Sequence, residues 1–119
     1  MRESGRKAMR RRLDEEMRPF RLAGRNKSPT NELLRAARQA LRITVEEIAE
    51  KMGVNRSTVF DLETREGKST ITLRSMSRLA EAMGCQVVYG IVPKGGKTLE
   101  RLAEERLWAA VLGKTGTGD

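Results

Sequence analysis

The chain has 119 residues, of which 38% are hydrophobic and only 3% aromatic, so it suits one small domain with extensions. Its net charge of +8 favours nucleic acid or an acidic surface as a partner, with solubility alone as the alternative. Because it contains no histidine and a single cysteine, Cys85, we expect no internal disulfide, metal site or cofactor, and a reducing cytoplasm as its location.

The excess positive charge lies in an N-terminal arm, residues 1–27, which carries 10 Lys/Arg against 4 Asp/Glu. The spacing of Met9, Leu13 and Met17 predicts a helix over residues 6–18, which Pro19 should end or kink. A docked basic helix is the favoured interpretation of this arm, and a disordered tail is the alternative. The arm lacks the apolar stretch of a secretion signal, and no run in the chain is long enough to span a membrane.

After a predicted linker at residues 23–28, residues 28–84 are predicted to form a four-helix domain. Ser28 as a cap and Pro29 at the first helical position should start its first helix. The apolar stripe of that helix consists of Leu33, Leu34, Ala37 and Leu41. Thr72 should cap the fourth helix, and Gly84 should close it.

Two short helices between these should cross at a steep angle. Thr44 with Glu47 forms a predicted capping box, so the second helix starts at Val45, and Gly53 suits its left-handed end. Asn55 should cap the third helix, which a loop over residues 65–70 follows. The residues expected to face inward on the two helices are Ile48, Ala49, Met52, Val59 and Leu62.

Residues 85–93, CQVVYGIVP, alternate in polarity and are predicted to form a β-strand. A single strand leaves its backbone groups unpaired, so we expect it to pair with the same strand of a second subunit. Val87, Val88, Tyr89 and Ile91 would form that dimer interface. The alternative is a strand covered by the N-terminal arm or by a last helix, which Thr98 should open within residues 94–119 before the frayed end at 113–119.

The spacing of the inward residues over 46–63, with a small residue at Ala49 and a turn at Gly53, is typical of a helix-turn-helix. This stretch resembles the helix-turn-helix of the phage-repressor and xenobiotic-response-element family of regulators. The resemblance implies a mainly α, lambda-repressor-like bundle, here with a C-terminal dimerising β-strand and flanking helices. It also implies a structural pair between Arg38 and Glu63.

In that family the third helix lies in the major groove, and its N-terminal residues reach base edges. By position, Arg56, Ser57 and Asp61 would read bases, with Arg56 donating to the O6 and N7 atoms of a guanine. Phe60 is expected to point outward, either onto a thymine methyl or as a lone exposed apolar residue. The residues expected to hold phosphate are Asn55, Thr58, Arg65, Lys68 and Arg74, the last three being otherwise solvated surface charges.

The second helix departs from the family's usual pattern, because it begins with Val45 and Glu46 instead of Gln or a similar phosphate-contacting residue. Residues 28–84 are also close to neutral, with a net charge of +1, so their non-specific DNA affinity should be weak. We therefore expect the N-terminal arm to contribute backbone or minor-groove contacts through Arg10, Arg11 and Arg12. The alternatives for these arginines are solubility or an acidic protein partner.

Three further motifs, LDEEMRPF (13–20), TITLRSMSRLAEAMGCQVVYGIVP (70–93) and the closing helix, are similar to the small family called mobile mystery protein A. Members are helix-turn-helix regulators commonly encoded beside a partner with a Fic domain. The resemblance implies an antitoxin-like or autoregulatory repressor, which the strand prediction would make a dimer. The alternative is a protein-interaction module that inhibits the Fic-type partner with little sequence-specific DNA binding.

Enzymatic activity is not expected. The adjacent carboxylates Glu46/Glu47 and Glu104/Glu105 point in different directions on a helix, and Cys85 has no histidine to activate it. The GGK motif at 95–97 lacks the glycine spacing of a phosphate-binding loop.

Overall fold

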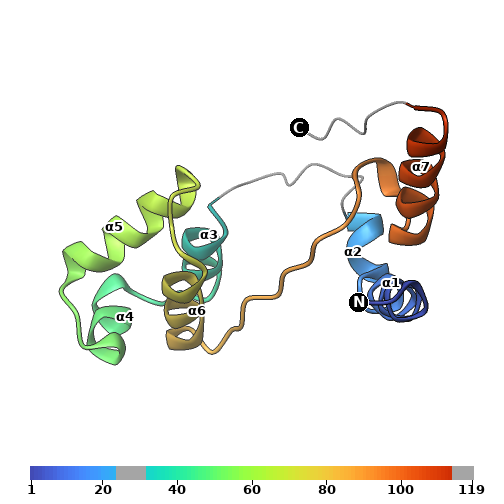
Figure 1. Ribbon diagram of the computed structural model, residues 1–119. Helices are drawn as coiled ribbons and strands as arrows, with labels where there is room; N and C mark the ends of the chain where they lie inside the picture. Colours follow the sequence, from blue (N-terminus) through green and yellow to red (C-terminus); the bar gives the residue numbers. More distant parts are fainter. Residues whose placement is uncertain (24–31, 114–119) are drawn as a thin grey trace. The chain divides into compact units, whose positions relative to one another are not determined.

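The computed structural model of the chain describes residues 1–23 and 32–113. These residues divide into two compact units, one from Met1–Lys27 with Tyr89–Asp119 and the other from Ser28–Val88. The helices are α1 (Glu3–Glu16), α2 (Arg18–Ala23), α3 (Leu33–Ala40), α4 (Val45–Met52), α5 (Arg56–Gly67), α6 (Leu73–Ala82) and α7 (Leu99–Val111), with a 3₁₀ turn, η1 (Lys94–Gly96) (Figure 1). Most of the predicted linker, with Ser28, Pro29 and the end at 114–119, lies outside the described residues.

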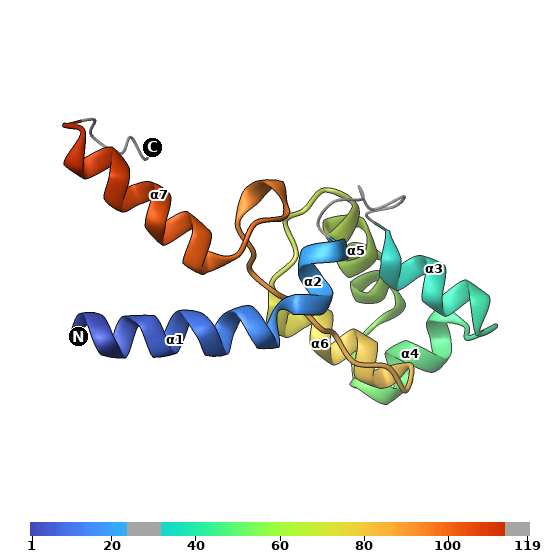
Figure 2. The same ribbon diagram turned by 90° about the vertical axis from the view of Figure 1, so that its right-hand side faces the viewer.

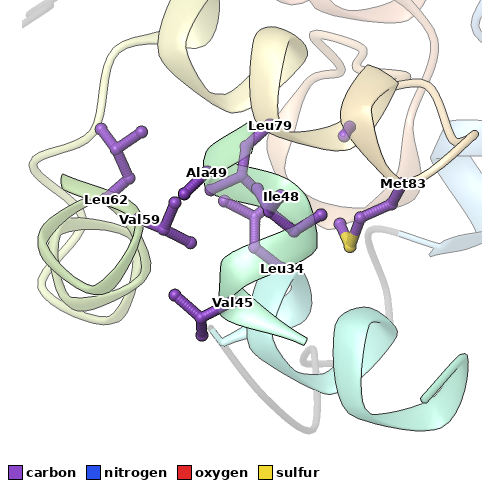
Figure 3. Close-up of a cluster of buried hydrophobic side chains, with 9 residues drawn as sticks. Leu34, Val45, Ile48, Ala49, Val59, Leu62, Leu79 and Met83 are labelled. Atoms are coloured by element: carbon purple, nitrogen blue, oxygen red, sulfur yellow. The ribbon is translucent and has the colours of Figure 1, made fainter. Parts of the chain in front are cut away.

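Unit Ser28–Val88 is a bundle of the four helices α3 to α6 around one small hydrophobic core. Ile48 of α4, Val59 of α5 and Leu79 of α6 have no exposed surface, so each of these helices is fixed by at least one fully buried side chain (Figure 3). The remaining buried hydrophobic residues are Leu34, Val45, Ala49, Leu62, Ala80 and Met83. Aliphatic side chains alone therefore build the core, as the low aromatic content requires.

Local signals set most helix ends in this unit. Thr44 and Glu47 form the predicted capping box, with the Thr44 hydroxyl accepting from the Glu47 backbone N–H at 3.1 Å. Gly53 ends α4 in the left-handed conformation at φ 69°, which a residue with a Cβ adopts at a cost. Thr72 caps α6 by accepting from the Ser75 N–H at 3.0 Å, and Gly84 follows that helix at φ 77°.

Helices α3 and α5 differ from the predicted boundaries. Helix α3 begins at Leu33, because Glu32 is non-helical, and its first N–H groups are satisfied by a carboxylate from α5. Glu66 accepts from the Leu33 N–H at 3.1 Å and from the Leu34 N–H at 2.8 Å. This tertiary contact keeps Glu66 buried and helical, so α5 continues to Gly67 where a loop from residue 65 was predicted. That part of the loop prediction was wrong.

Two residues of the predicted apolar stripe on α3 are also more exposed than expected. Leu33 is 57% exposed and Leu41 is 52% exposed, whereas Leu34 is buried. Since Leu33 lies at the first position of the helix and Leu41 just after its last, neither is held over the core.

The unit formed by Met1–Lys27 and Tyr89–Asp119 is built on helices α1 and α7. The two helices are antiparallel and converge where the C-terminal end of α1 meets the N-terminal end of α7 (Figure 2). There the Asp14 carboxylate accepts from the Leu99 N–H at 2.7 Å and from the Glu100 N–H at 3.2 Å. Thr98 caps α7 as predicted, and Pro19 follows the break between α1 and α2 at Met17. No described residue of this unit is buried.

Residues 85–93 are extended but form no strand, so the described residues are helices, turns and irregular segments. The prediction of a β-strand was wrong for a single chain, because a strand requires a neighbouring backbone and residues 86–93 make no backbone hydrogen bond to a described residue. The alternative, a strand covered by the N-terminal arm or the last helix, is also not seen as a strand, but the arm does cover one point of the segment. A Cβ on Gly90 would lie 2.7 Å from Cγ of Phe20 and 2.9 Å from Sδ of Met17.

None of the described helices has the length and apolar character needed to cross a membrane.

Candidate nucleic-acid interface

The candidate site is the N-terminal half of α5, which the core holds in a fixed orientation. Val59 and Leu62 lie on the buried side of the helix, and Ala49 of α4 is small and 6% exposed where these helices pack. The short turn through Gly53 and Val54 joins α4 to α5, so the two helices form a helix-turn-helix. The residues between the buried positions on α5 therefore face solvent in a fixed arrangement.

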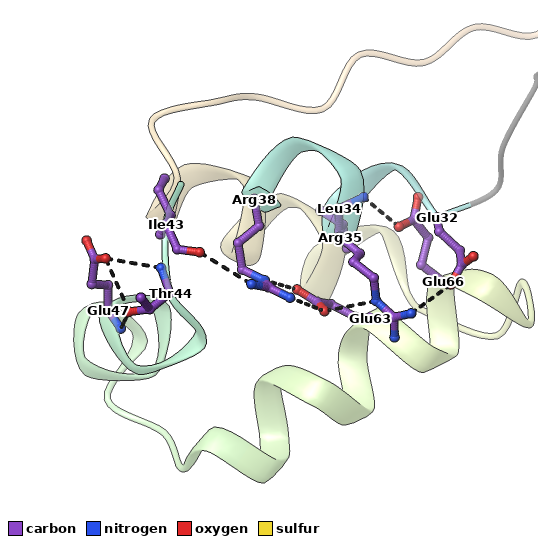
Figure 4. A network of polar contacts seen from close by, with 9 residues as sticks. All are labelled: Glu32, Leu34, Arg35, Arg38, Ile43, Thr44, Glu47, Glu63 and Glu66. Atoms are coloured by element: carbon purple, nitrogen blue, oxygen red, sulfur yellow. Dashed lines mark hydrogen bonds and ion pairs between the residues drawn. The ribbon is translucent and has the colours of Figure 1, made fainter. Parts of the chain in front are cut away.

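A buried ion pair fixes α5 against α3 from the other side. Nε and Nη2 of Arg38 donate to the two carboxylate oxygens of Glu63 at 2.7 and 3.2 Å, and the Glu63 side chain has no exposed surface (Figure 4). Arg38 also donates to the carbonyl of Ile43, and Arg35 lies 3.5 Å from Glu63. The side-chain hydrogen bonds with Glu63 raise the pKa of Arg38, so the guanidinium stays charged. The contact between Arg38 and Glu63 therefore joins α3 to α5, with the Glu63 side chain shielded from solvent.

Asn55 and Ser57, on either side of the first residue of α5, leave their side chains uncommitted to the fold. Asn55 occupies the N-cap position with extended backbone, but its side chain makes no capping hydrogen bond. This corrects the expectation that the Asn55 amide caps the helix. Asn55 and Ser57 are both exposed, and neither side chain has a partner among the described residues. Both can donate to a ligand together with the free N–H groups at the start of the helix.

Arg56 is exposed but is not free. Its Nε lies 2.9 Å from Oε2 of Glu46, which belongs to the first turn of α4. Its guanidinium carbon also lies 5.6 Å from the centroid of the Phe60 ring, one turn along α5. Phe60 is 42% exposed and does point outward. The side chain predicted to read a guanine is thus oriented by a carboxylate and an aromatic ring.

The other predicted contacts lie at different positions around α5 and α6. Asp61 forms an ion pair with Arg65 at 2.9 Å, so these two opposite charges compensate each other in the free protein. Thr58 is only partly exposed. Lys68, directly after α5, and Arg74, in the first turn of α6, are exposed and make no ion pair with a described residue. Lys68 and Arg74 therefore keep their full charge available.

The predicted arginines of the arm belong to the other unit, where their environments differ. Arg10 lies 2.7 Å from Glu100 and 2.8 Å from Glu3, and hydrogen bonds with these carboxylates raise its pKa. Its side chain is only 19% exposed, so it joins α1 to α7. Arg11 and Arg12 are exposed and carry no ion pair to a described residue.

Sequence reasoning missed the roles of two glutamates. It placed Glu66 in a loop, and nothing in its local sequence indicates that it satisfies the N-terminus of a helix about thirty residues earlier. It treated Glu46 only as an unfavourable charge near phosphate. The signal for Glu46 is its place in the first turn of α4, which the turn brings close to the first turn of α5.

A family model described as helix-turn-helix matches residues 34–89, which cover nearly all of α3 and the whole of α4 to α6. No curated protein and no solved structure matched the chain. The match supports the predicted type of helix-turn-helix and a DNA-binding regulator. It does not extend to the narrower resemblance to mobile mystery protein A, which stays a prediction.

Proposed function

We propose that this protein is a sequence-specific regulator of transcription that binds double-stranded DNA as a dimer and represses its own gene, as antitoxin-like proteins do. One observation carries the proposal. The start of α5 presents Asn55, Arg56 and Ser57 to solvent on a helix that the core and the Arg38–Glu63 pair hold rigid. A helix with exposed donors at its N-terminus is the element that enters a major groove.

In this proposal Arg56 reads a guanine, while Ser57 and Asp61 contact neighbouring bases. Asn55, Lys68 and Arg74 contact phosphate with the help of Thr58 and Arg65. Arg11 and Arg12 add phosphate contacts from the arm. Arg10, which was also expected to contact DNA, is left out of this proposal because its guanidinium is engaged in ion pairs with Glu3 and Glu100.

The dimer is proposed from residues 85–93. The backbone of residues 86–93 is unpaired within the described chain, while Val88, Tyr89 and Ile91 are 67%, 66% and 81% exposed. An extended segment of this kind pairs readily with an identical segment about a two-fold axis. Val87 is partly buried against the core of unit Ser28–Val88, which ties the segment to the helix-turn-helix.

The test is fluorescence anisotropy on DNA from upstream of the gene that encodes the chain, with a scrambled duplex as competitor over a salt series. We expect preference for the upstream duplex, and Arg56→Ala should reduce that preference by about 1–3 kcal/mol. Deletion of residues 1–12 should make the salt dependence shallower. Equal binding to both duplexes would contradict the proposal.

The second candidate function is that of an antitoxin that binds and inhibits a protein partner, which the resemblance suggests is a Fic-domain protein. The exposed apolar residues of α7 and of the turn after it favour this function, since Leu107, Trp108, Val111 and Leu112 are each about 65% exposed on a unit in which no described residue is buried. Such a partner-binder should be indifferent to Arg56→Ala. Co-expression with the neighbouring gene product and co-purification would test it.

A further inference from the structure

Within the described part of the chain, Arg56 is the one predicted base reader of α5 whose side chain contacts a residue from another helix. Glu46 approaches its Nε from α4, and Phe60 lies under its guanidinium from α5. Two contacts from different directions restrict a side chain that would otherwise sample many rotamers. The guanidinium therefore has a preferred orientation before any DNA binds.

That orientation leaves the part of Arg56 that recognises a base unoccupied. The ion pair with Glu46 is made at Nε, and neither Nη group donates a hydrogen bond to a described residue. A guanidinium carries five N–H donors, of which two suffice for the O6 and N7 atoms of guanine. Arg56 can thus keep its contact with Glu46 while its Nη groups engage a base.

The same contact makes Arg56 a poor phosphate ligand. Non-specific DNA binding depends on uncompensated positive charge, and the Glu46 carboxylate neutralises Arg56 while repelling nearby phosphates. The pair is exposed on both sides, with side-chain exposures of 61% for Arg56 and 58% for Glu46, so its strength is modest. It is therefore sufficient to bias Arg56 and weak enough to rearrange on a cognate site.

We propose that Glu46 is a positioning residue for Arg56, which increases discrimination for guanine and decreases binding to DNA of unrelated sequence. This inference rests on the proposed function. It also gives a reason why α4 begins with a negative charge, Glu46, where the family that the sequence resembles often has a phosphate-contacting residue.

The test compares the wild type with Glu46→Ala, Arg56→Ala and the double variant. Anisotropy would give the Kd for the preferred duplex, for a scrambled duplex, and for preferred duplexes in which one guanine at a time is replaced by 7-deazaguanine, which lacks N7. The matched control is Glu50→Ala, which removes the same charge from α4, since Glu50 is exposed and has no ion pair to a described residue. Thermal unfolding would verify that each variant is folded.

We expect Glu46→Ala to tighten binding to the scrambled duplex and to lower the guanine discrimination ratio by about two- to fivefold, the range of an exposed ion pair. In the Arg56→Ala background, Glu46→Ala should leave the guanine ratio unchanged, because the residue through which it acts is absent. Glu50→Ala should keep the wild-type guanine ratio.

The failures are distinguishable. If the wild type binds preferred and scrambled duplexes equally, the proposed function itself fails. Two results would overturn the positioning role of Glu46 while leaving sequence-specific binding intact. In the first, the wild type discriminates but Glu46→Ala keeps the wild-type guanine discrimination ratio. In the second, Glu46→Ala lowers that ratio by the same factor with and without Arg56.

Discussion

At the scale of single residues, Glu63 is the most consequential charge of the helix-turn-helix. Its side chain has no exposed surface, and that of its main partner, Arg38, is 12% exposed. Removing Arg38 leaves the buried Glu63 carboxylate with only the longer ion pair to Arg35, which is costly. We expect Arg38→Ala to lower the free energy of unfolding by about 3 kcal/mol, measured by urea denaturation at pH 7.

Arg35 provides the control for that prediction. It also faces Glu63, but at 3.5 Å and with its side chain 39% exposed. Because Arg35 is partly exposed and its contact is the longer one, Arg35→Ala leaves Glu63 paired with Arg38 and should cost no more than about 1 kcal/mol. Equal losses for the two variants would show that Glu63 does not depend mainly on Arg38.

The capping box predicts a pH dependence. Hydrogen bonds from the backbone and side chain of Thr44 lower the pKa of Glu47 from its ordinary value of 4.5. A carboxyl group with a lowered folded-state pKa stabilises the protein above its unfolded-state pKa, and this contribution is lost as the pH falls through the folded-state value. Glu47→Gln should therefore show a shallower loss of stability than the wild type between about pH 5 and about pH 3 in urea titrations. Parallel profiles would contradict this assignment.

At the scale of helices, the three N-caps of the helix-turn-helix unit that have extended backbone are not equivalent. Thr44 and Thr72 accept hydrogen bonds from their helices, whereas the Asn55 side chain does not. We expect Thr72→Ala to cost about 1 kcal/mol of stability and Asn55→Ala less than about 0.5 kcal/mol. Asn55→Ala should instead weaken DNA binding, which anisotropy would measure. A large loss of stability with unchanged DNA binding would place Asn55 in the fold alone.

Helix ends also show which parts of the structure were predictable from the sequence. The ends at Thr44, Gly53, Thr72 and Gly84 were predicted because each depends on residues within one turn. The start of α3 was not predictable in this way, because the Glu66 carboxylate that satisfies it comes from a helix about thirty residues away. The same contact explains why α5 runs past its predicted end.

In the candidate site, too, local features were predictable from the sequence and contacts between helices were not. Inward and outward positions on α5 follow from helical periodicity, so the exposed positions of Asn55, Arg56, Ser57 and Phe60 could be read from the pattern. The partners of those side chains depend on the angle between α4 and α5, which a pattern does not give. The ion pair between Glu46 and Arg56 therefore appears only with the structure.

At the scale of the whole molecule, the two units differ in how completely they bury their apolar residues. The unit of α3 to α6 has a closed core, whereas the unit of α1, α2 and α7 has no buried described residue. Helix α7 carries several apolar residues, but one of them, Trp108, is 64% exposed. Helical periodicity shows which apolar residues share a face of the helix. Whether that face becomes buried depends on another element packing against it.

Close packing at Gly90 makes the N-terminal arm sensitive to a single methyl group. A Cβ there would lie within 3 Å of Phe20 and Met17, which is closer than side chains tolerate. Gly90→Ala should therefore loosen the arm from the extended segment, seen as faster proteolysis of residues 1–23, while the helix-turn-helix still unfolds at its wild-type temperature. Unchanged proteolysis would show that the arm does not depend on this contact.

The proposed dimer, formed through residues 85–93, is a property of the whole molecule that bears on its affinity for DNA. Under the proposed function, a dimer would gain DNA affinity by presenting two copies of α5 at once, which a nearly neutral helix-turn-helix needs. Ile91 is 81% exposed in a segment with an unpaired backbone, so Ile91→Lys should leave the single chain folded but prevent self-pairing. Sedimentation should then show a monomer for Ile91→Lys and a dimer for both the wild type and the control Leu41→Lys, whose side chain is exposed after α3. A wild type that sediments as a monomer would contradict the proposed dimer.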